Sequence, residues 1–296
     1  MVAKNSLRRA LDDGRAHVVG LIPFMNIISS TEALSRIQEA LAAARAIFAR
    51  FTPGDVQAEY KAGNDPVTLA DTQVDAALRK CLLRPGEGWL SEESVDDPIR
   101  LESSWVWIVD PLDGTREFVQ GIPEWCCSIG LAHSGQAFAG GICNPATGET
   151  FVGSVESGLL FNGKPAQPSS RATLQDAVVL ASRSEVKRGE WEQFQGKSFE
   201  VRPTGSVAYK LACVAAGLAD ATWTLTPKHE WDVAAGVALI HSAGGFTSTL
   251  EGLPLVFNNR KPKLTGLLAG GPQLKNEVIA LTSAAEKPAP RTPQVP

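Results

Sequence analysis

The sequence predicts a mixed fold in which helices and a meandering sheet (α+β) come first and alternating strands and helices (α/β) follow. Apolar residues recur at helical spacing in Thr31–Phe51, whereas Trp105–Val109 is a short and wholly apolar run, which is typical of a buried strand. With 296 residues, the chain is long enough for one large domain or two of about 150 residues. Either arrangement allows a large buried core.

The first half contains the signals of two helices and a series of strands. Ser29 and Glu32 have the spacing of a capping box before the first helix, and Pro53 ends it. Turn residues such as Asn144-Pro145 separate the strands. We expect helices at Thr31–Phe51 and about 69–83, and strands at Val56–Tyr60, Trp105–Val109, Ser128–His133, Ala137–Ile142 and Thr150–Val155.

The second half alternates strands with helices. Strands are expected at Val178–Ser182 and near Ala221–Leu225, and helices at Ser206–Leu218 and Trp231–Ala243. The stretch 165–175 is rich in Pro and Ser and has no periodicity. We therefore predict an N-terminal subdomain at 29–168 and a C-terminal one at 169–284.

The two ends of the chain are expected to lie outside this fold. Arginines precede an apolar stretch within residues 1–28, but Pro23 and Asn26 interrupt it, so we interpret this segment as a leader of uncertain order. The Pro-rich tail, residues 285–296, is predicted to be disordered. No apolar run reaches the roughly 18 residues that a membrane span needs.

Composition limits the classes of partner. The 28 basic and 32 acidic residues give a net charge of -4, which offers no basic field for nucleic acid or anionic lipid. A phosphate ligand would need local help, from a cation or from backbone N–H groups. The five cysteines are an odd set without CxxC spacing, which indicates buried free thiols and a reducing, cytoplasmic compartment.

Two aspartates follow the buried strand. Asp110 stands at its C-terminal end, and Asp113 stands where the chain bends, in the run Asp110-Pro111-Leu112-Asp113-Gly114-Thr115. Pro111 fixes its own φ, and Gly114 lets the backbone come close to a ligand. A simple capped turn uses the same residue types. The motif alone therefore leaves a structural and a functional interpretation open.

Glu92 and Asp232 extend the acidic set. Glu92 follows the apolar pair Trp89-Leu90, and if it converges with Asp110 and Asp113, each pair of carboxylates repels by about 4 kcal/mol at 4 Å. A divalent cation would neutralise them, and oxygen ligands favour Mg²⁺ or Mn²⁺ over zinc. Asp232 opens an alanine-rich helix and can equally be its N-cap.

Two further aspartates and a turn complete the candidates. Asp71 and Asp75 lie four residues apart on one helix face; we expect Asp75 in solvent and Asp71 within reach of the metals through water. The N–H groups of Gly114 and Thr115, at a helix start, form an anion site without a basic side chain. This turn supplies the local help that a phosphate needs.

Four segments in this order resemble the inositol monophosphatase superfamily of lithium-sensitive, magnesium-dependent phosphatases. They are Asp65-Pro66-Val67-Thr68 with Asp71, Ser91-Glu92-Glu93-Ser94, Asp110-Pro111-Leu112-Asp113-Gly114-Thr115 and Trp231-Asp232-Val233-Ala234-Ala235-Gly236. The resemblance spans about Thr31 to Thr282. It implies a layered α-β-α-β-α sandwich of the inositol monophosphatase and sugar phosphatase type.

The resemblance also implies roles for individual residues. One Mg²⁺ would bind Glu92, Asp110 and the Leu112 carbonyl, and a second would bind Asp110, Asp113 and Asp232. A third, weak ion would bind near Glu92, and Mn²⁺ can substitute. Thr115 and Asp71, assisted by Glu92, would position or deprotonate the attacking water. The expected phosphate- and substrate-binding residues are Asp113, Gly114, Thr115, Gly205, Ser206 and Lys228.

The branch within the superfamily is decided by weaker signals. Thr115-Arg116-Glu117-Phe118 is similar to the 3′(2′),5′-bisphosphate nucleotidases (the CysQ branch), and the acidic residue that grips inositol hydroxyls has no counterpart in Trp223-Thr224-Leu225-Thr226. Asn144-Pro145 is more like the inositol branch. Four basic residues could bind a second phosphate: Arg183, Lys187, Arg188 and Lys228. Each of them can also be a solvated surface charge.

We therefore expect a phosphoric monoester hydrolase acting on adenosine 3′,5′-bisphosphate. The alternatives are an inositol-1-monophosphatase and a phosphatase for another small sugar or histidinol phosphate. A catalytically inactive relative that acts as a binding partner is a further alternative, but this sequence has a suitable residue at every metal-ligand position that the resemblance implies. The expected partner is a small phosphorylated metabolite, with no nucleic acid, no membrane and a homodimer as one possible state.

Overall fold

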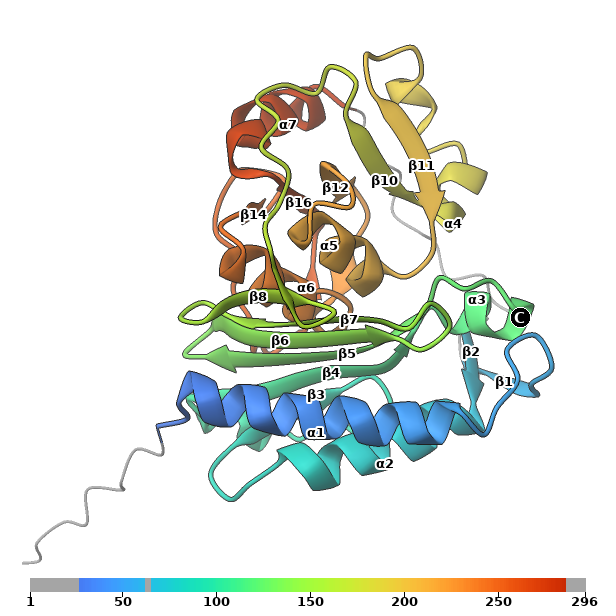
Figure 1. The fold of residues 1–296 in the computed structure, drawn as a ribbon, viewed down its shortest axis with the longest axis vertical. Coiled ribbons are helices and arrows are strands. Elements are labelled where there is room, and N and C mark those ends of the chain that lie inside the picture. Colours follow the sequence, from blue (N-terminus) through green and yellow to red (C-terminus); the bar gives the residue numbers. More distant parts are fainter. Residues whose placement is uncertain (1–26, 62–64, 286–296) are drawn as a thin grey trace, which may run out of the picture.

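The computed structural model describes residues 27–61 and 65–285, which form five layers (Figure 1). The helices are α1 (Ser30–Phe48), α2 (Leu69–Leu82), α3 (Thr115–Gln120), α4 (Arg183–Lys187), α5 (Val207–Ala215), α6 (Glu230–Ser242) and α7 (Lys275–Ser283). The strands are β1 (Ala58–Lys61), β2 (Asp65–Thr68), β3 (Gly88–Ser91), β4 (Trp105–Asp113), β5 (Cys126–His133), β6 (Gln136–Asn144), β7 (Glu149–Ser154), β8 (Gly158–Phe161), β9 (Lys164–Ala166), β10 (Val178–Ser182), β11 (Glu200–Thr204), β12 (Ala221–Thr224), β13 (Lys228–His229), β14 (Phe246–Ser248), β15 (Lys263–Leu264) and β16 (Leu267–Gly270).

The first layer is the pair α1 and α2, which covers one face of the larger sheet (Figure 1). The apolar stripe of α1 is buried because Ala33, Ile37 and Leu41 recur on one side of the helix. The Ser29 hydroxyl caps this helix by accepting a hydrogen bond from the Glu32 amide. On α2, by contrast, Asp75 was expected in solvent but is buried.

The larger sheet has seven strands in the order β3-β4-β5-β6-β7-β8-β9. Strand β3 runs parallel to β4, and the remaining neighbours are antiparallel. Every residue of β4 is buried: Val106 and Ile108 pack toward α5 and α6, whereas Trp107 and Val109 pack toward α1 and α2. A strand with both faces covered needs apolar residues at every position, which explains the unbroken run in the sequence.

The middle layer is α5 and α6, which lie between the larger sheet and a second sheet of five strands. The second sheet has the order β11-β10-β12-β16-β14, with α4 and α7 beyond it. Helix α6 lies very close to the larger sheet, because a Cβ at Gly140 would come 2.5 Å from the Ala235 carbonyl oxygen. This contact fixes the height of α6 above β5 and β6, and with it the position of the first turn of α6.

The layered fold predicted from the sequence is confirmed. The expected helices and strands all form, with ends that shift by up to a few residues. The change of sheet falls between Ala166 and Val178, inside the interval of the expected subdomain boundary, although the division into two subdomains stays a prediction. Strands not foreseen include β3, β8, β9, β11, β14 and β16.

Two expectations concern the chain ends. Of the predicted leader, residues 1–28, the first 26 lie outside the described residues. Its last residue, Ile28, is buried in the core beside α1 and therefore belongs to the fold. Of the predicted tail, residues 286–296 lie outside the described residues.

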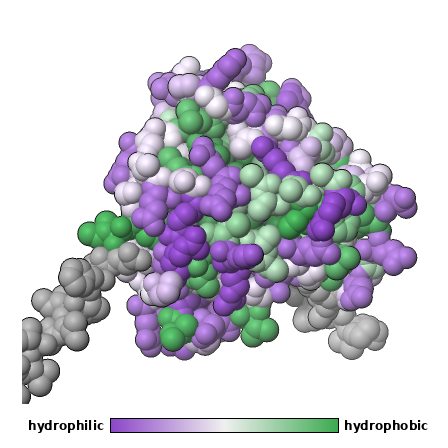
Figure 2. All heavy atoms as spheres, turned by 60° about the horizontal axis from the view of Figure 1, so that its bottom comes forward, coloured by the Kyte–Doolittle hydropathy of each residue, from purple (hydrophilic) through white to green (hydrophobic). Residues whose placement is uncertain are grey.

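Within the part of the chain that is described, no helix is long and apolar enough to cross a membrane. The face shown in Figure 2 carries hydrophobic side chains near its middle, bordered by hydrophilic ones.

Candidate metal centre

Three carboxylates from distant parts of the chain converge at one edge of the larger sheet. Oxygen atoms of Glu92, Asp110 and Asp232 all lie within 4.8 Å of one another. The parallel pairing of β3 and β4 explains two of them. Ser91, the last residue of β3, lies opposite Val109, so Glu92 just past β3 and Asp110 in the last part of β4 come next to each other. The third comes from the first turn of α6, which the close packing against the sheet places above that edge.

Asp113 joins this cluster through a bulge. The pairing of β4 with β5 shifts between Asp110 and Asp113, and the charge of Asp113 is close enough to raise the pKa of Asp110. One oxygen of Asp113, Oδ2, accepts hydrogen bonds from the Ser206 hydroxyl and the Ala208 amide, each at 2.6 Å. Asp113 is thus fixed by the start of α5, and Ser206 adopts a positive φ of 54° there.

The first turn of α6 is fixed from two sides. The Asp232 carboxylate accepts a hydrogen bond from the His229 amide at 2.9 Å, as in a capping box. The fully buried carboxylate of Glu230 accepts hydrogen bonds from the Asn258 and Asn259 amides at 2.7 and 2.9 Å. Asp232 is therefore an N-terminal helix residue, as the structural interpretation held, and a member of the cluster as well.

The electrostatics of the cluster is that of crowded acids. Burial raises the pKa of Asp110 well above its usual range, and the charges of Glu92, Asp113 and Asp232 raise it further. Burial also raises the pKa of Asp232 to about 8, together with Asp113 and Glu92, although Lys228 lowers it. Neighbouring carboxylates that disfavour the charge of Asp110 and Asp232 are best accommodated around bound cations.

The donor set fits magnesium. All side-chain donors are carboxylate oxygens, and the Leu112 carbonyl lies in the same turn, which is the chemistry that Mg²⁺ and Mn²⁺ prefer. Among the described residues, no histidine or cysteine joins the metal-ligating cluster. The expected ligands Glu92, Asp110 and Asp232 are brought together, and Asp113 lies beside them.

Asp71 and Thr115 form a proton-bearing pair next to this cluster. The Thr115 hydroxyl lies 3.2 Å from Asp71 Oδ1 and 2.9 Å from the Leu112 carbonyl oxygen. The other oxygen of Asp71 accepts hydrogen bonds from the Thr68 amide and hydroxyl, at 2.8 and 2.6 Å. Burial raises the pKa of Asp71 to about 6, although Thr68 lowers it. This carboxylate is suited to accept a proton through the Thr115 hydroxyl at neutral pH.

The turn after the bulge requires glycine. Gly114 has a φ of 95°, and a Cβ there would lie 2.8 Å from the Glu124 carbonyl oxygen. Its neighbour Thr115 begins α3. Gly205 is similarly enclosed, since a Cβ would lie 2.6 Å from the Glu117 side chain. Gly114, Thr115, Gly205 and Ser206 thus border the cluster, but their contact with a phosphate stays a prediction.

One sequence expectation is wrong. Asp75 was expected in solvent, yet it is buried, with its two oxygens accepting hydrogen bonds from the Ser91 and Ser94 hydroxyls at 2.5 Å each. These serines flank Glu92, so Asp75 fixes the segment that carries a metal-ligand candidate. The serine spacing around Glu92 was visible in the sequence, but nothing in it linked these serines to the helix.

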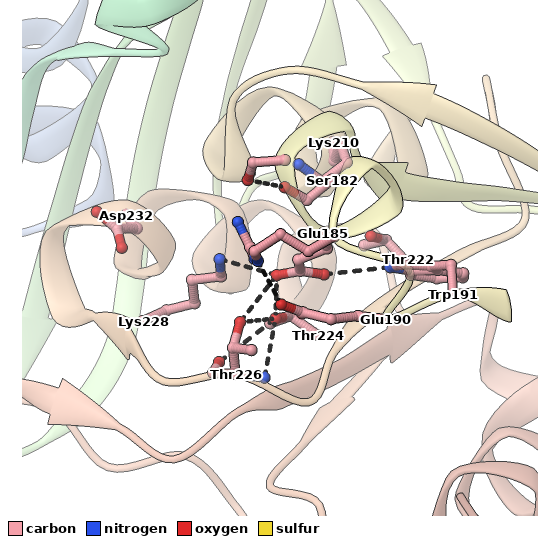
Figure 3. Close-up of polar contacts among 12 residues, drawn as sticks. Ser182, Glu185, Glu190, Trp191, Lys210, Thr222, Thr224, Thr226, Lys228 and Asp232 are labelled. Carbon is pink, nitrogen blue, oxygen red and sulfur yellow. Dashed lines mark hydrogen bonds and ion pairs between the residues drawn. The ribbon is translucent and has the colours of Figure 1, made fainter. Parts of the chain in front are cut away.

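The basic residues near the site are largely paired. Arg183 forms two hydrogen bonds with Glu124, at 2.5 and 2.6 Å, and Arg188 pairs with Glu190. Figure 3 shows Lys228 directed toward Glu185 of α4, to which its Nζ lies at 3.0 Å. Burial raises the pKa of Glu185, but Lys228 and the Thr224 hydroxyl outweigh it and lower the value to about 2.

Lys210 is a functional candidate that the sequence did not suggest. Its ammonium is buried and donates to the Thr204 and Ser206 carbonyl oxygens, at 3.3 and 2.7 Å. Burial lowers its pKa, whereas the nearby charge of Asp113 raises it. A cavity of about 10 Å³, room for one water, lies between Lys210, Lys228 and Glu185. In the sequence, the only signal for Lys210 was its position in a helix that is otherwise largely apolar.

The sequence and the fold are similar to those of known proteins. Residues 30–287 match the family described as "Inositol monophosphatase family". The chain is 36% identical to the inositol-1-monophosphatase of Mesorhizobium japonicum, over 85% of this chain and 95% of that protein. It is 32% identical to the inositol-1-monophosphatase of Rhizobium meliloti, over 80% and 88%. A solved structure, the extragenic suppressor protein suhB of Bartonella henselae, superposes with a TM-score of 0.72 and 31% identity, covering 86% of this chain and 99% of that one.

Proposed function

Because this chain belongs to the inositol monophosphatase family of phosphatases, we propose that it is a Mg²⁺-dependent hydrolase of small polyol phosphate monoesters, with inositol-1-phosphate as its substrate. The observation that carries the proposal is the convergence of Glu92, Asp110 and Asp232 within 4.8 Å, with Asp113 beside them. The names of the similar proteins favour the inositol branch over the nucleotidase branch that the Thr115–Phe118 run suggested.

The carboxylates would hold the metal, and other residues would handle the substrate. Mg²⁺ bound by Glu92, Asp110, Asp113, Asp232 and the Leu112 carbonyl would lower the pKa of a water and neutralise charge on the phosphate. The Thr115 hydroxyl would orient the attacking water, and Asp71 Oδ1 would take its proton through that hydroxyl. The amides of Gly114 and Thr115 would hold the phosphoryl oxygens in line for attack.

A second candidate substrate is adenosine 3′,5′-bisphosphate. It is favoured by Lys210 and Lys228, two ammonium groups that stand beside Asp113 and Asp232. Glu185 already accepts hydrogen bonds from Thr224, Thr226 and Trp191, so it keeps neutral donors when Lys228 turns to a substrate anion. The Gly205-Ser206 turn would border the same group.

Parallel assays separate the two substrates. Turnover of inositol-1-phosphate and of adenosine 3′,5′-bisphosphate is measured with Mg²⁺, with Mn²⁺ and with added Li⁺, which we expect to inhibit. We expect inositol-1-phosphate to have the higher kcat/KM. The second candidate is correct if the unaltered chain has the higher kcat/KM for the bisphosphate and Lys228→Met lowers that value about tenfold or more while leaving inositol-1-phosphate unchanged. Absence of metal-dependent phosphatase activity on both would refute the proposal.

A further inference from the structure

A surface cavity of about 190 Å³ lies between α1 and the strands β7 and β8, and it shares no residue with the carboxylate cluster. Leu41 and Val152 form a buried apolar part of its lining, and the partly exposed Leu160 extends it. Arg45 and Thr150 line it as well. The cavity therefore combines apolar walls with one cation and one hydroxyl.

Arg45 is held in place by neutral groups. Its Nη2 donates to the Thr150 hydroxyl and to the Glu149 carbonyl oxygen, the latter at 3.4 Å. The Glu149 carboxylate is engaged elsewhere, since it accepts hydrogen bonds from the Tyr209 and Thr147 hydroxyls at 2.5 and 2.6 Å. Thr150 and Glu149 thus fix the guanidinium without neutralising it.

The charge of Arg45 is not matched by a carboxylate among the residues that the structure describes. Other partly or fully buried arginines are matched: Arg36 pairs with Glu87, and Arg100 pairs with Asp96. Arg45 as a residue is only partly buried and lines the cavity, so its charge is accessible to a ligand there. A guanidinium presents a planar fork that binds a carboxylate with two parallel hydrogen bonds.

We infer that this cavity is a binding site for a small carboxylate with an apolar body, in which Arg45 and Thr150 bind the carboxylate and Leu41, Val152 and Leu160 contact the body. Pockets for drug-sized ligands have volumes of about 300–1,000 Å³, so this one takes a smaller molecule. Benzoate, with a planar apolar ring and one carboxylate, has the required chemistry. Inorganic phosphate lacks the apolar body, and benzamide lacks the charge.

Isothermal titration of the full chain with benzoate tests this inference. We expect one site per chain with a dissociation constant of about 1 mM, as is usual for a ligand of this size. The titration is run with and without Mg²⁺, because a carboxylate that binds through the metal would require the ion. In the titrations without Mg²⁺, which keep phosphate from the proposed metal site, benzamide and inorganic phosphate are expected to bind at least about tenfold more weakly, since each lacks one half of the recognition.

Two variants and a control locate the site. Arg45→Gln should weaken benzoate binding at least about tenfold, because it removes the charge-assisted pair. Leu160→Trp should weaken it by filling the cavity while Arg45 remains. Arg50→Gln, at an exposed position just past the end of the same helix, should bind benzoate like the unaltered chain. The inference is overturned if the unaltered chain does not bind benzoate, if both cavity variants bind it normally, or if benzoate binding needs Mg²⁺. It is also overturned if, without Mg²⁺, phosphate or benzamide binds as tightly as benzoate.

Discussion

Asp110→Asn separates the electrostatic role of the cluster from its structural role. The Asp110 oxygen Oδ1 accepts a hydrogen bond from the Leu112 amide at 3.0 Å, and an asparagine carbonyl can accept the same bond. The substitution therefore removes one negative charge with little change of shape. Asp110 has Glu92 and Asp232 within 4.8 Å, and at an effective dielectric of 20 each such pair of charges repels by about 3 kcal/mol.

Without metal, the folded chain either carries these charges against their repulsion or holds protons that the unfolded chain releases, as the raised pKa values of Asp110 and Asp232 indicate. Both destabilise the folded state, so the metal-free variant should melt at a higher temperature than the metal-free unaltered protein. With metal, the order should change. An ion present at about 100 times its dissociation constant stabilises the folded state by about 2.7 kcal/mol, which raises the melting temperature of a chain of this size by about 5–11 °C. The variant should lose most of this increase.

Thermal unfolding followed by circular dichroism, in EDTA and in Mg²⁺, measures both effects. Glu102→Gln is the control, since it removes one negative charge at an exposed position and should keep the full response to Mg²⁺. The reasoning is refuted if Asp110→Asn melts lower than the unaltered chain in EDTA, or if Mg²⁺ stabilises the variant as much as it stabilises the unaltered chain.

Three further outcomes are expected. Asp113→Asn should lower kcat at least about a hundredfold in a phosphate-release assay and leave the circular dichroism spectrum unchanged. The amide oxygen can still accept the hydrogen bond from Ser206, but the side chain no longer carries a negative charge. Unchanged turnover would exclude Asp113 from the site. The pKa of Asp232 is raised to about 8 without metal, so a proton must leave before Mg²⁺ binds. The Mg²⁺ affinity measured by calorimetry should therefore fall up to about tenfold per pH unit from pH 8 toward pH 6. The same raised pKa means that the folded state of the metal-free protein should lose stability as the pH rises toward 8. Gly114→Ala should lower the free energy of unfolding in urea by about 2 kcal/mol, because φ is 95° and a Cβ would approach the Glu124 carbonyl oxygen; equal stability would contradict the turn geometry.

The sequence predicted the elements whose pattern is local. Strand β4 was recognised because both its faces are buried, and α1 because one face is. Strand β11 was missed because Glu200–Thr204 is polar and contains a proline; it is extended because it pairs with β10 at the edge of the second sheet. Its conformation is set by its neighbour, which no local pattern contains.

The same limit applies to the site. The metal-ligand candidates were found because each stands in a short, recognisable turn. Their supports were not found, because Ser206 is 93 residues from Asp113 and Ser94 is 19 residues from Asp75. For Asp75, the four-residue spacing from Asp71 suggested a solvated face, and only the packing of α2 against β3 and the segment after it shows why the carboxylate is buried. Side chains that act through such contacts leave no signal in spacing.

The structural interpretation of the acidic residues does not exclude the functional one, because a carboxylate has two oxygens. Among the described residues, hydrogen bonds reach only Oδ1 of Asp110, only Oδ2 of Asp113 and only Oδ2 of Asp232. In each case a backbone amide fixes one oxygen, as in an ordinary turn or helix cap, and the second oxygen remains for a cation. Such fixing lowers the entropy that a metal site must lose on binding. A turn or cap that looks sufficient to explain an aspartate is therefore no argument against metal binding, because the same hydrogen bond would orient the free oxygen toward a cation.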